Sequence, residues 1–257
     1  MREGDSSSDD WKILTKRFEE NLNPIEHNRF LDATFILTKS KDVSRVNIEM
    51  LRKLKCLVAK ICAVHTGGKE AEKADSDVGM GLEAVLLLAK GCRIMLMANL
   101  WTEVGLVNGS MGIVKDILFE NEGPPALSTV IFIKFDEYNG PTIKDVKGDE
   151  VVPIAPIRRS WENKNGKMCS RLQIPICLAW AITVHKSQGL TLEKARIDIG
   201  NKEFAAGLAF VTVSRVCLLK NICFRQFDFN RLQRIKDCKR LEERKVEEER
   251  LHSMILL

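Results

Sequence analysis

One segment of the chain gathers polar side chains that could hold an anion. The apolar stretch LAWAI is followed at once by residues 183–189, which read TVHKSQG. Hydroxyl, imidazole and ammonium groups donate hydrogen bonds to phosphate oxygens, and a glycine lets the backbone approach a ligand closely. Loops that follow the strands of an α/β sheet are where such sheets present ligand-binding residues. The pattern therefore predicts an anion site at residues 183–189.

The chain contains no phosphate-binding loop of the Walker A type, which needs Gly-x-x-x-x-Gly-Lys followed by Ser or Thr. Its two Gly-Lys pairs, at 68–69 and 166–167, are followed by Glu70 and Met168. Neither residue supplies the hydroxyl that holds magnesium, and a glutamate there would repel phosphate. The run TVIFIKF ends in Asp-Glu at 136–137, as a Walker B strand does. Because no phosphate loop precedes it, we interpret this run as a strand of a β-rich region.

A second candidate surface is the basic segment IRRSWENKNGKMCSR at 157–171. It holds five basic residues, one acidic residue and Trp161, with Arg158 and Arg159 adjacent to one another. Basic charge beside an aromatic ring is the usual make-up of a single-strand binding surface, because it combines phosphate attraction with base stacking. A solvated hairpin with a packed tryptophan fits the same pattern, and the sequence leaves both interpretations open.

Composition places the chain among proteins with a real core. Its 257 residues are 45% hydrophobic and 29% charged, with a net charge of +5. No apolar run approaches the ~18 residues that a bilayer crossing needs, and the N-terminus is polar and acidic. The eight cysteines never form Cys-x-x-Cys, so we expect reduced, mostly buried thiols and no metal site. We therefore expect a soluble, intracellular protein with no membrane partner.

The first part of the chain mixes helical and strand patterns. We expect a helix around 11–22, a strand at 34–37, and an amphipathic helix in which Asp42 is the N-cap. Its apolar face would contain Val43, Val46, Met50 and Leu54. Residues 65–82 are small, charged and rich in glycine, which is typical of an exposed loop.

The rest of the chain alternates between strands and ambiguous segments. Short strands at close spacing over 107–175 indicate a small β-barrel or an open sheet inserted into something larger. ARIDI at 195–199 reads as a strand, whereas FAAGLAFVTVSRV at 204–216 fits a helix or a strand equally well. The tail over 231–251 reads as a solvated helix because charged residues outnumber apolar ones.

Four segments together resemble one enzyme family. LAWAITVHKSQGLTL, at 178–192, closely resembles motif V of the Pif-type and RecD-like DNA helicases of superfamily one. VTVSR, at 211–215, resembles their motif VI, and ATFILTKSKDVSRVN, at 33–47, resembles motif IV. The segment 91–114 is similar to the one that leads into the family's small inserted barrel. The four segments occur in the family's order and cover most of residues 11–230.

The resemblance implies an α/β fold, the second RecA-like, P-loop-NTPase-type domain of such a helicase without Walker A. Residues 31–106 and 176–230 would form that domain, and 107–175 an inserted Src-homology-like small β-barrel. Residues 1–30 would form an N-terminal polar helix or linker, and 231–257 a charged helical tail.

The resemblance also implies roles for individual residues. Arg215 would be the arginine finger that stabilises charge during phosphoryl transfer, with Gln188 and Gly189 beside it on the nucleotide. The DNA contacts would come from Thr183, His185, Lys186 and Thr38, together with Arg158, Arg159 and Trp161 of the basic segment. The alternatives are an ion pair with a surface carboxylate for Arg215 and a simple solvated lysine for Lys186.

The function expected from these residues is that of the C-terminal portion of an ATP-dependent 5′-to-3′ DNA helicase. Its partners would be single-stranded DNA and a polypeptide carrying the Walker A domain. ATP and Mg²⁺ would bind only with such a first RecA-like domain present, so the chain alone should be inactive. A DNA substrate implies a nuclear setting. The alternatives are a stand-alone nucleic-acid-binding module, a non-functional helicase remnant, and a metabolic enzyme that binds a phosphorylated small molecule.

Overall fold

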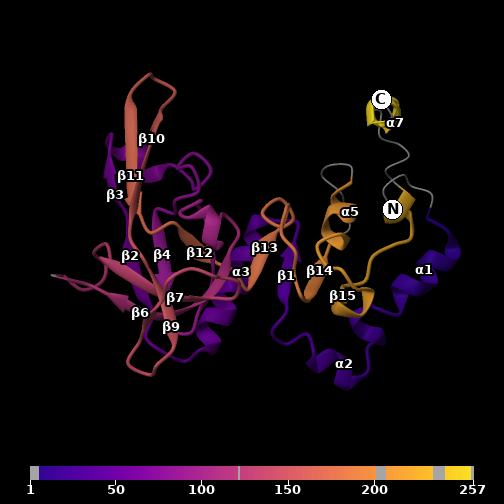
Figure 1. The fold of residues 1–257 in the computed structure, drawn as a ribbon, viewed down its shortest axis with the longest axis horizontal. Helices are drawn as coiled ribbons and strands as arrows, with labels where there is room; N and C mark the ends of the chain where they lie inside the picture. Colours follow the sequence, from indigo (N-terminus) through magenta and orange to yellow (C-terminus); the bar gives the residue numbers. More distant parts are fainter. Residues whose placement is uncertain (1–5, 121, 201–206, 234–240, 256–257) are drawn as a thin grey trace. The chain divides into compact units, whose positions relative to one another are not determined.

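The chain forms two compact units in a computed structural model that describes residues 6–120, 122–200, 207–233 and 241–255 (Figure 1). Unit 1 comprises Met1–Ser44 and Ala181–Leu257, and unit 2 comprises Arg45–Trp180. Unit 2 thus extends further along the chain, at both ends, than the insertion at 107–175 predicted from the sequence. The domain boundaries assigned by resemblance stay a prediction.

Unit 1 is built on a four-stranded parallel sheet in the order β13-β1-β14-β15. Its strands are β1 (Thr34–Leu37), β13 (Ala181–Thr183), β14 (Ala195–Asp198) and β15 (Ile222–Phe224). Most of their side chains are buried, as is typical of parallel strands. The strands predicted at 34–37 and within ARIDI are confirmed. Because the strands are parallel, their carboxyl ends share one edge of the sheet.

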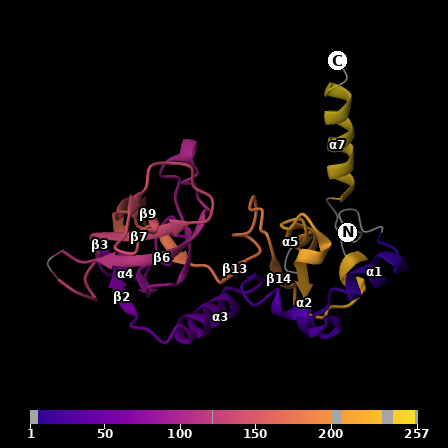
Figure 2. The ribbon, with the colours of Figure 1, turned by 60° about the horizontal axis from the view of Figure 1, so that its bottom comes forward.

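Short helices complete unit 1. They are α1 (Ser8–Thr15), η1 (Glu19–Asn21), α2 (Pro24–Asn28), α5 (Leu208–Val213), η3 (Leu219–Asn221), α6 (Asn230–Gln233) and α7 (Leu241–Ile255). The helix expected around 11–22 is confirmed only as far as Thr15, where α1 ends. The 3₁₀ turn η1 follows, and a separate helix begins at Pro24, where proline favours a first turn. The described part of the ambiguous segment at 204–216 contains the helix α5, which ends at Val213 before two turn residues and a bridge at Val216. The helix predicted in the tail is confirmed by α7 (Figure 2), while 234–240 lie outside the described residues.

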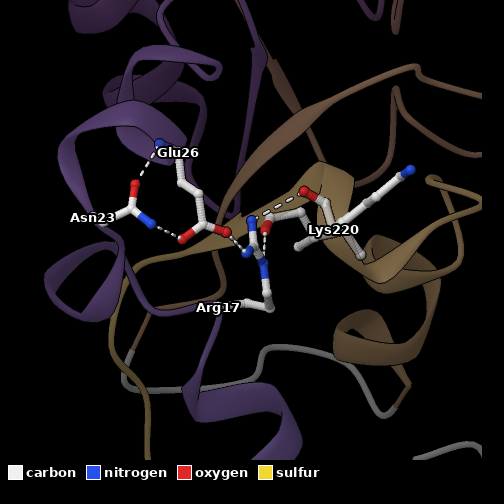
Figure 3. A network of polar contacts seen from close by, with 5 residues as sticks. Arg17, Asn23, Glu26 and Lys220 are labelled. Atoms are coloured by element: carbon white, nitrogen blue, oxygen red, sulfur yellow. Dashed lines mark hydrogen bonds and ion pairs between the residues drawn. The ribbon is translucent and has the colours of Figure 1, made fainter.

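The buried side chain of Arg17 links the N-terminal segment to β15 by hydrogen bonds (Figure 3). The Nε and Nη2 atoms of Arg17 each donate to a main-chain carbonyl, of Ile222 and Lys220, at 3.0 Å. Its Nη1 atom donates to the carboxylate of Glu26 at 2.7 Å, and Asn23 in turn caps the helix that carries Glu26. Arg17 holds the pKa of the Glu26 carboxyl below its ordinary value. Arg17 therefore links the segment before β1 to β15 and to Lys220 just before it.

The strand pairs described in unit 2 are antiparallel. A six-stranded sheet runs in the order β12-β5-β6-β7-β9-β8. Its strands are β5 (Arg93–Leu96), β6 (Met111–Leu118), β7 (Val130–Phe135), β8 (Ile143–Lys144), β9 (Glu150–Ile154) and β12 (Ile176–Leu178). Among the described strands, the two end strands β12 and β8 are not paired with each other. Closure into the small barrel therefore stays a prediction.

Two smaller sheets flank this one within unit 2. The first, in the order β10-β11-β3, contains β3 (Val64–Thr66), β10 (Ile157–Glu162) and β11 (Met168–Gln173). The second pairs β2 (Ala59–Cys62) with β4 (Val85–Leu88). A short 3₁₀ turn, η2 (Thr102–Val104), lies between β5 and β6. One apolar core, including Ile61, Leu88, Ile94 and Ile131, joins the β2–β4 pair to the six-stranded sheet.

Two local predictions need correction. Helix α3 (Ser40–Lys53) begins before Asp42, which lies in its first turn, and its buried residues are Asn47 and Leu51. The buried face of α3 is therefore displaced by about one residue from the apolar face predicted from the sequence. The loop expected over 65–82 also contains the end of β3 and the helix α4 (Lys69–Lys73).

Candidate nucleic-acid interface

The 183–189 loop leaves the carboxyl end of β13 as two consecutive tight turns. The amide of Val184 donates to the carbonyl of Leu37 at 3.0 Å, which keeps the loop's start aligned with β1. The amide of Lys186 donates to the hydroxyl of Thr183 at 3.2 Å, and that of Ser187 donates to the Thr183 carbonyl at 3.0 Å. The loop is thus folded by its own main chain and by the hydroxyls of Thr183 and Ser187.

The side chains of this loop divide into a buried and an accessible set. Ser187 is fully buried, whereas His185, Gln188 and Gly189 are exposed and Thr183 and Lys186 are half-buried. Gly189 has a φ of +80°, the left-handed region that favours glycine. The sequence had assigned the hydroxyl of Ser187 to an anion, and its burial corrects that interpretation.

Thr38 lies at the same edge of the sheet as this loop. It follows β1 directly, and the last residue of β1, Leu37, is in register with Thr183 of β13. A Cβ atom added to Gly200, just beyond β14, would lie 3.5 Å from the Thr38 hydroxyl oxygen. The parallel sheet therefore brings Thr38 and Thr183 to neighbouring strand ends, as a shared binding surface needs.

Arg215 follows α5 and is held by neutral acceptors. Its Nε atom donates to the carbonyl of Val211 at 2.9 Å and its Nη1 atom to that of Leu190 at 3.3 Å. Its Nη2 atom donates to the Ser214 hydroxyl at 2.8 Å. Within the described part of the chain, Arg215 makes no ion pair with a carboxylate. A guanidinium has about five N–H donors, so donors are left over for an anion.

The main chain ties Arg215 to the end of the 183–189 loop. The amide of Leu192 donates to the Arg215 carbonyl at 2.8 Å, and Leu192 forms a parallel bridge with Val216. Together with the side-chain bond to Leu190, this places the two helicase-like motifs side by side.

The β10–β11 hairpin does not gather its predicted residues on one face. Along β10, Arg158 is exposed and donates to the Ser170 hydroxyl at 3.0 Å. Arg159 and Trp161 are half-buried on the opposite face, and Arg159 donates to the carbonyl of Met80. The hairpin predicted from the sequence is confirmed, but its basic and aromatic groups are divided between two faces.

Arg171, one of the five basic residues of that segment, is fully buried. Its guanidinium donates to the main-chain carbonyls of Leu82 at 2.6 Å, Ala74 at 2.7 Å and Ala71 at 2.9 Å. It also lies 5.7 Å from the ring centroid of Trp161. Burial lowers the pKa of Arg171. This side chain organises residues 69–82 and contributes nothing to a basic surface.

Asp136, the first residue of the acidic pair that follows β7, has a structural partner. The Asp136 carboxylate forms an ion pair with Arg93, with Nη1 at 2.7 Å. Strand β7 pairs antiparallel with β6 and β9. This confirms its interpretation as a strand of a β-rich region and not as a Walker B strand.

Other predicted features can be placed more briefly. Among the described residues, no group of three or more His, Cys, Asp or Glu side chains could hold a metal ion. In the same ranges no helix is both long and apolar enough to span a bilayer. Of the described cysteines, Cys56 and Cys217 are exposed, Cys62 is half-buried and the rest are buried; none of the described cysteines forms a disulfide. Burial raises the pKa of Cys92 and Cys223 to about 11.

The parallel sheet and its strand-end loop define the class of protein, a RecA-like domain joined to a β-rich unit. No family model matches the chain. "ATP-dependent DNA helicase PIF1" of Rattus norvegicus and of Homo sapiens are each 32% identical over 196 residues, 76% of this chain and 28% of the relative. "ATP-dependent DNA helicase PIF6" of Trypanosoma brucei brucei is 29% identical over 226 residues, 83% of this chain and 26% of the relative. The chain is a homologue of the Pif1-type DNA helicases.

Solved structures support the same fold. The Pif1 helicase of Candida albicans matches with a TM-score of 0.65 at 20% identity, over 99% of this chain and 59% of that one. Bacteroides Pif1 in complex with ADP-AlF3 and single-stranded DNA matches with a TM-score of 0.59 at 24% identity, over 89% and 48%. The chain spans little more than a quarter of the length of its rat and human relatives.

Proposed function

We propose that the chain is the C-terminal portion of an ATP-dependent 5′-to-3′ DNA helicase, which supplies a single-stranded DNA contact and the arginine finger. The observation that carries the proposal is the arrangement of unit 1. The 183–189 loop leaves the strand-end edge that also carries Thr38, and Arg215 is held against the end of that loop by neutral groups. The polarity of unwinding comes from the family.

The DNA contact rests on the accessible groups of the loop. The hydroxyl oxygen of Thr183 accepts a hydrogen bond from the Lys186 amide, and among the described residues its proton has no acceptor, so it can donate to a phosphate oxygen. His185 is exposed beside it, and Lys186 and Thr38 add a cation and a second hydroxyl. Contacts of this kind position the DNA backbone and carry no sequence information. Arg158, Arg159 and Trp161 stay a predicted second contact, with only Arg158 on the exposed face of β10.

The nucleotide role rests on Arg215, Gln188 and Gly189. Bound ATP with Mg²⁺ supplies the phosphoanhydride bond whose hydrolysis drives helicase movement. Arg215 fits this group as a fixed planar cation with donors left over, and the exposed amide of Gln188 can face it. The sequence contains no Walker A motif, so ATP must be held by a first RecA-like domain. We therefore propose that the chain alone neither hydrolyses ATP nor unwinds DNA.

The test compares DNA binding by the wild type and by Thr183→Ala/His185→Ala, using fluorescence anisotropy of labelled single-stranded DNA at several salt concentrations. We expect wild-type affinity to fall as salt rises, because phosphate contacts release counterions. The double variant should bind weakly at every salt concentration, while His252→Ala, which removes an exposed histidine of α7, should match the wild type. Equal binding by the double variant would refute the proposed DNA contact.

The absence of Walker A also favours a second candidate, a stand-alone nucleic-acid-binding module. The two candidates differ when a first RecA-like domain of a Pif1 relative is supplied. The helicase portion should then gain ATP hydrolysis that depends on Arg215, whereas a stand-alone module should bind DNA without any effect of ATP.

A further inference from the structure

Ser187 is the buried centre of the 183–189 loop. Its immediate neighbours His185, Lys186 and Gln188 are exposed or half-buried, whereas Ser187 itself is completely inaccessible to solvent. Its hydroxyl donates to the carbonyl of Val184 at 2.8 Å. A hydroxyl in this position cannot reach a phosphate.

Every polar group of Ser187 is directed back into the loop. Its amide donates to the carbonyls of Thr183 at 3.0 Å and Val184 at 3.2 Å. Its carbonyl accepts from the amide of Leu190 at 3.1 Å. The carbonyl of Leu190 in turn accepts from Arg215. One residue therefore joins the strand end, both turns of the loop and the segment that holds Arg215.

We infer that Ser187 is a positioning residue, which holds His185 and Lys186 in the geometry that contacts DNA without touching DNA itself. The inference rests on the proposed function. Without the hydroxyl, the Val184 carbonyl keeps only its longer bond to the Ser187 amide, and the first turn is free to open. DNA binding must then order the turn again, which weakens affinity.

The test is a double-mutant cycle on single-stranded DNA affinity in the full chain. Ser187→Ala should weaken binding by about 2- to 12-fold, the range to which the net strength of one ordinary hydrogen bond converts. In the Thr183→Ala/His185→Ala background, the same substitution should have no further effect, because the contacts that it positions are gone. An equal loss in both backgrounds would overturn the inference. Ser187→Cys keeps the shape and a weak donor, and should recover part of the affinity.

A matched control separates positioning from general stability. Ile36→Val removes one buried methylene group from β1 of the same sheet and touches no hydrogen bond of the loop. We expect it to lower the melting temperature of unit 1 while DNA affinity stays unchanged. If Ile36→Val weakens DNA binding as much as Ser187→Ala, the positioning role is wrong.

The double-mutant cycle also distinguishes failure of the positioning role of Ser187 from failure of the proposed function. If the Thr183→Ala/His185→Ala variant loses DNA binding and Ser187→Ala matches the wild type, the positioning role fails and the proposed function stands. If the wild type and the Thr183→Ala/His185→Ala variant bind equally, or if the wild type does not bind, the proposed function fails and the positioning role fails with it.

Discussion

Replacing Arg171 with methionine should destabilise unit 2, because this buried guanidinium is bonded to three main-chain carbonyls at 2.9 Å or less. Hydrogen bonds to a charged group contribute about 1.5–3 kcal/mol each, which gives an upper limit of about 5–9 kcal/mol. Two effects reduce this sum. Methionine avoids the cost of burying a charge, and residues 69–82 can open to water. We expect a net loss of about 2–4 kcal/mol.

Thermal unfolding and proteolysis measure this loss. For a unit of this size, about 2–4 kcal/mol lowers the melting temperature by about 6–12 °C. Trypsin should also cut faster after Lys69 and Lys73, because α4 loses the donor that holds its carbonyls. Arg159→Met is the matched control, since Arg159 is half-buried and donates to the single carbonyl of Met80. A melting temperature of Arg171→Met within about 2 °C of the wild type, with unchanged proteolysis, would refute this reasoning.

Three further predictions concern pH, the loop and the nucleotide. Burial, and then the charge of Arg171, lower the pKa of His65 below its ordinary 6.5. The unfolded chain therefore takes up this proton first, and unit 2 should lose stability as pH falls below about 6.5; pH-dependent melting should show a flatter profile for His65→Gln. Gly189→Ala forces a side chain into the left-handed region and should cost about 1–2 kcal/mol in chemical denaturation, with weaker DNA binding; unchanged values would contradict the turn geometry. In an enzyme completed with a first RecA-like domain, Arg215→Lys should lower kcat for ATP hydrolysis by about 10³-fold or more with little effect on KM, and a wild-type rate would exclude the arginine finger.

The features visible in the sequence were those fixed by local patterns. Strand β1 occupies the predicted residues 34–37, because a short run of β-branched, aromatic and apolar residues between polar ones favours a strand. The 183–189 loop was identified because an apolar strand leads directly into a dense polar cluster. The four family-like segments then predicted the RecA-like fold.

The features that the sequence concealed depend on tertiary contacts. Arg171 reads as a surface cation in a basic segment, and only its packing against the carbonyls of residues 69–82 makes it a buried centre. Ser187 reads as a phosphate donor, yet the turn directs its hydroxyl inward. The buried face of α3 is displaced because Asn47 donates to the carbonyl of Leu178 across unit 2. Side-chain polarity alone predicts none of these outcomes.

The central claim is that the 183–189 loop contacts the DNA backbone, and salt-dependent binding of single-stranded DNA tests it most directly. The account predicts that wild-type affinity falls steeply with salt, and that Thr183→Ala/His185→Ala loses both affinity and part of the salt slope. A folded wild-type chain that fails to bind DNA at low salt would contradict the claim, as would a double variant with unchanged affinity and slope.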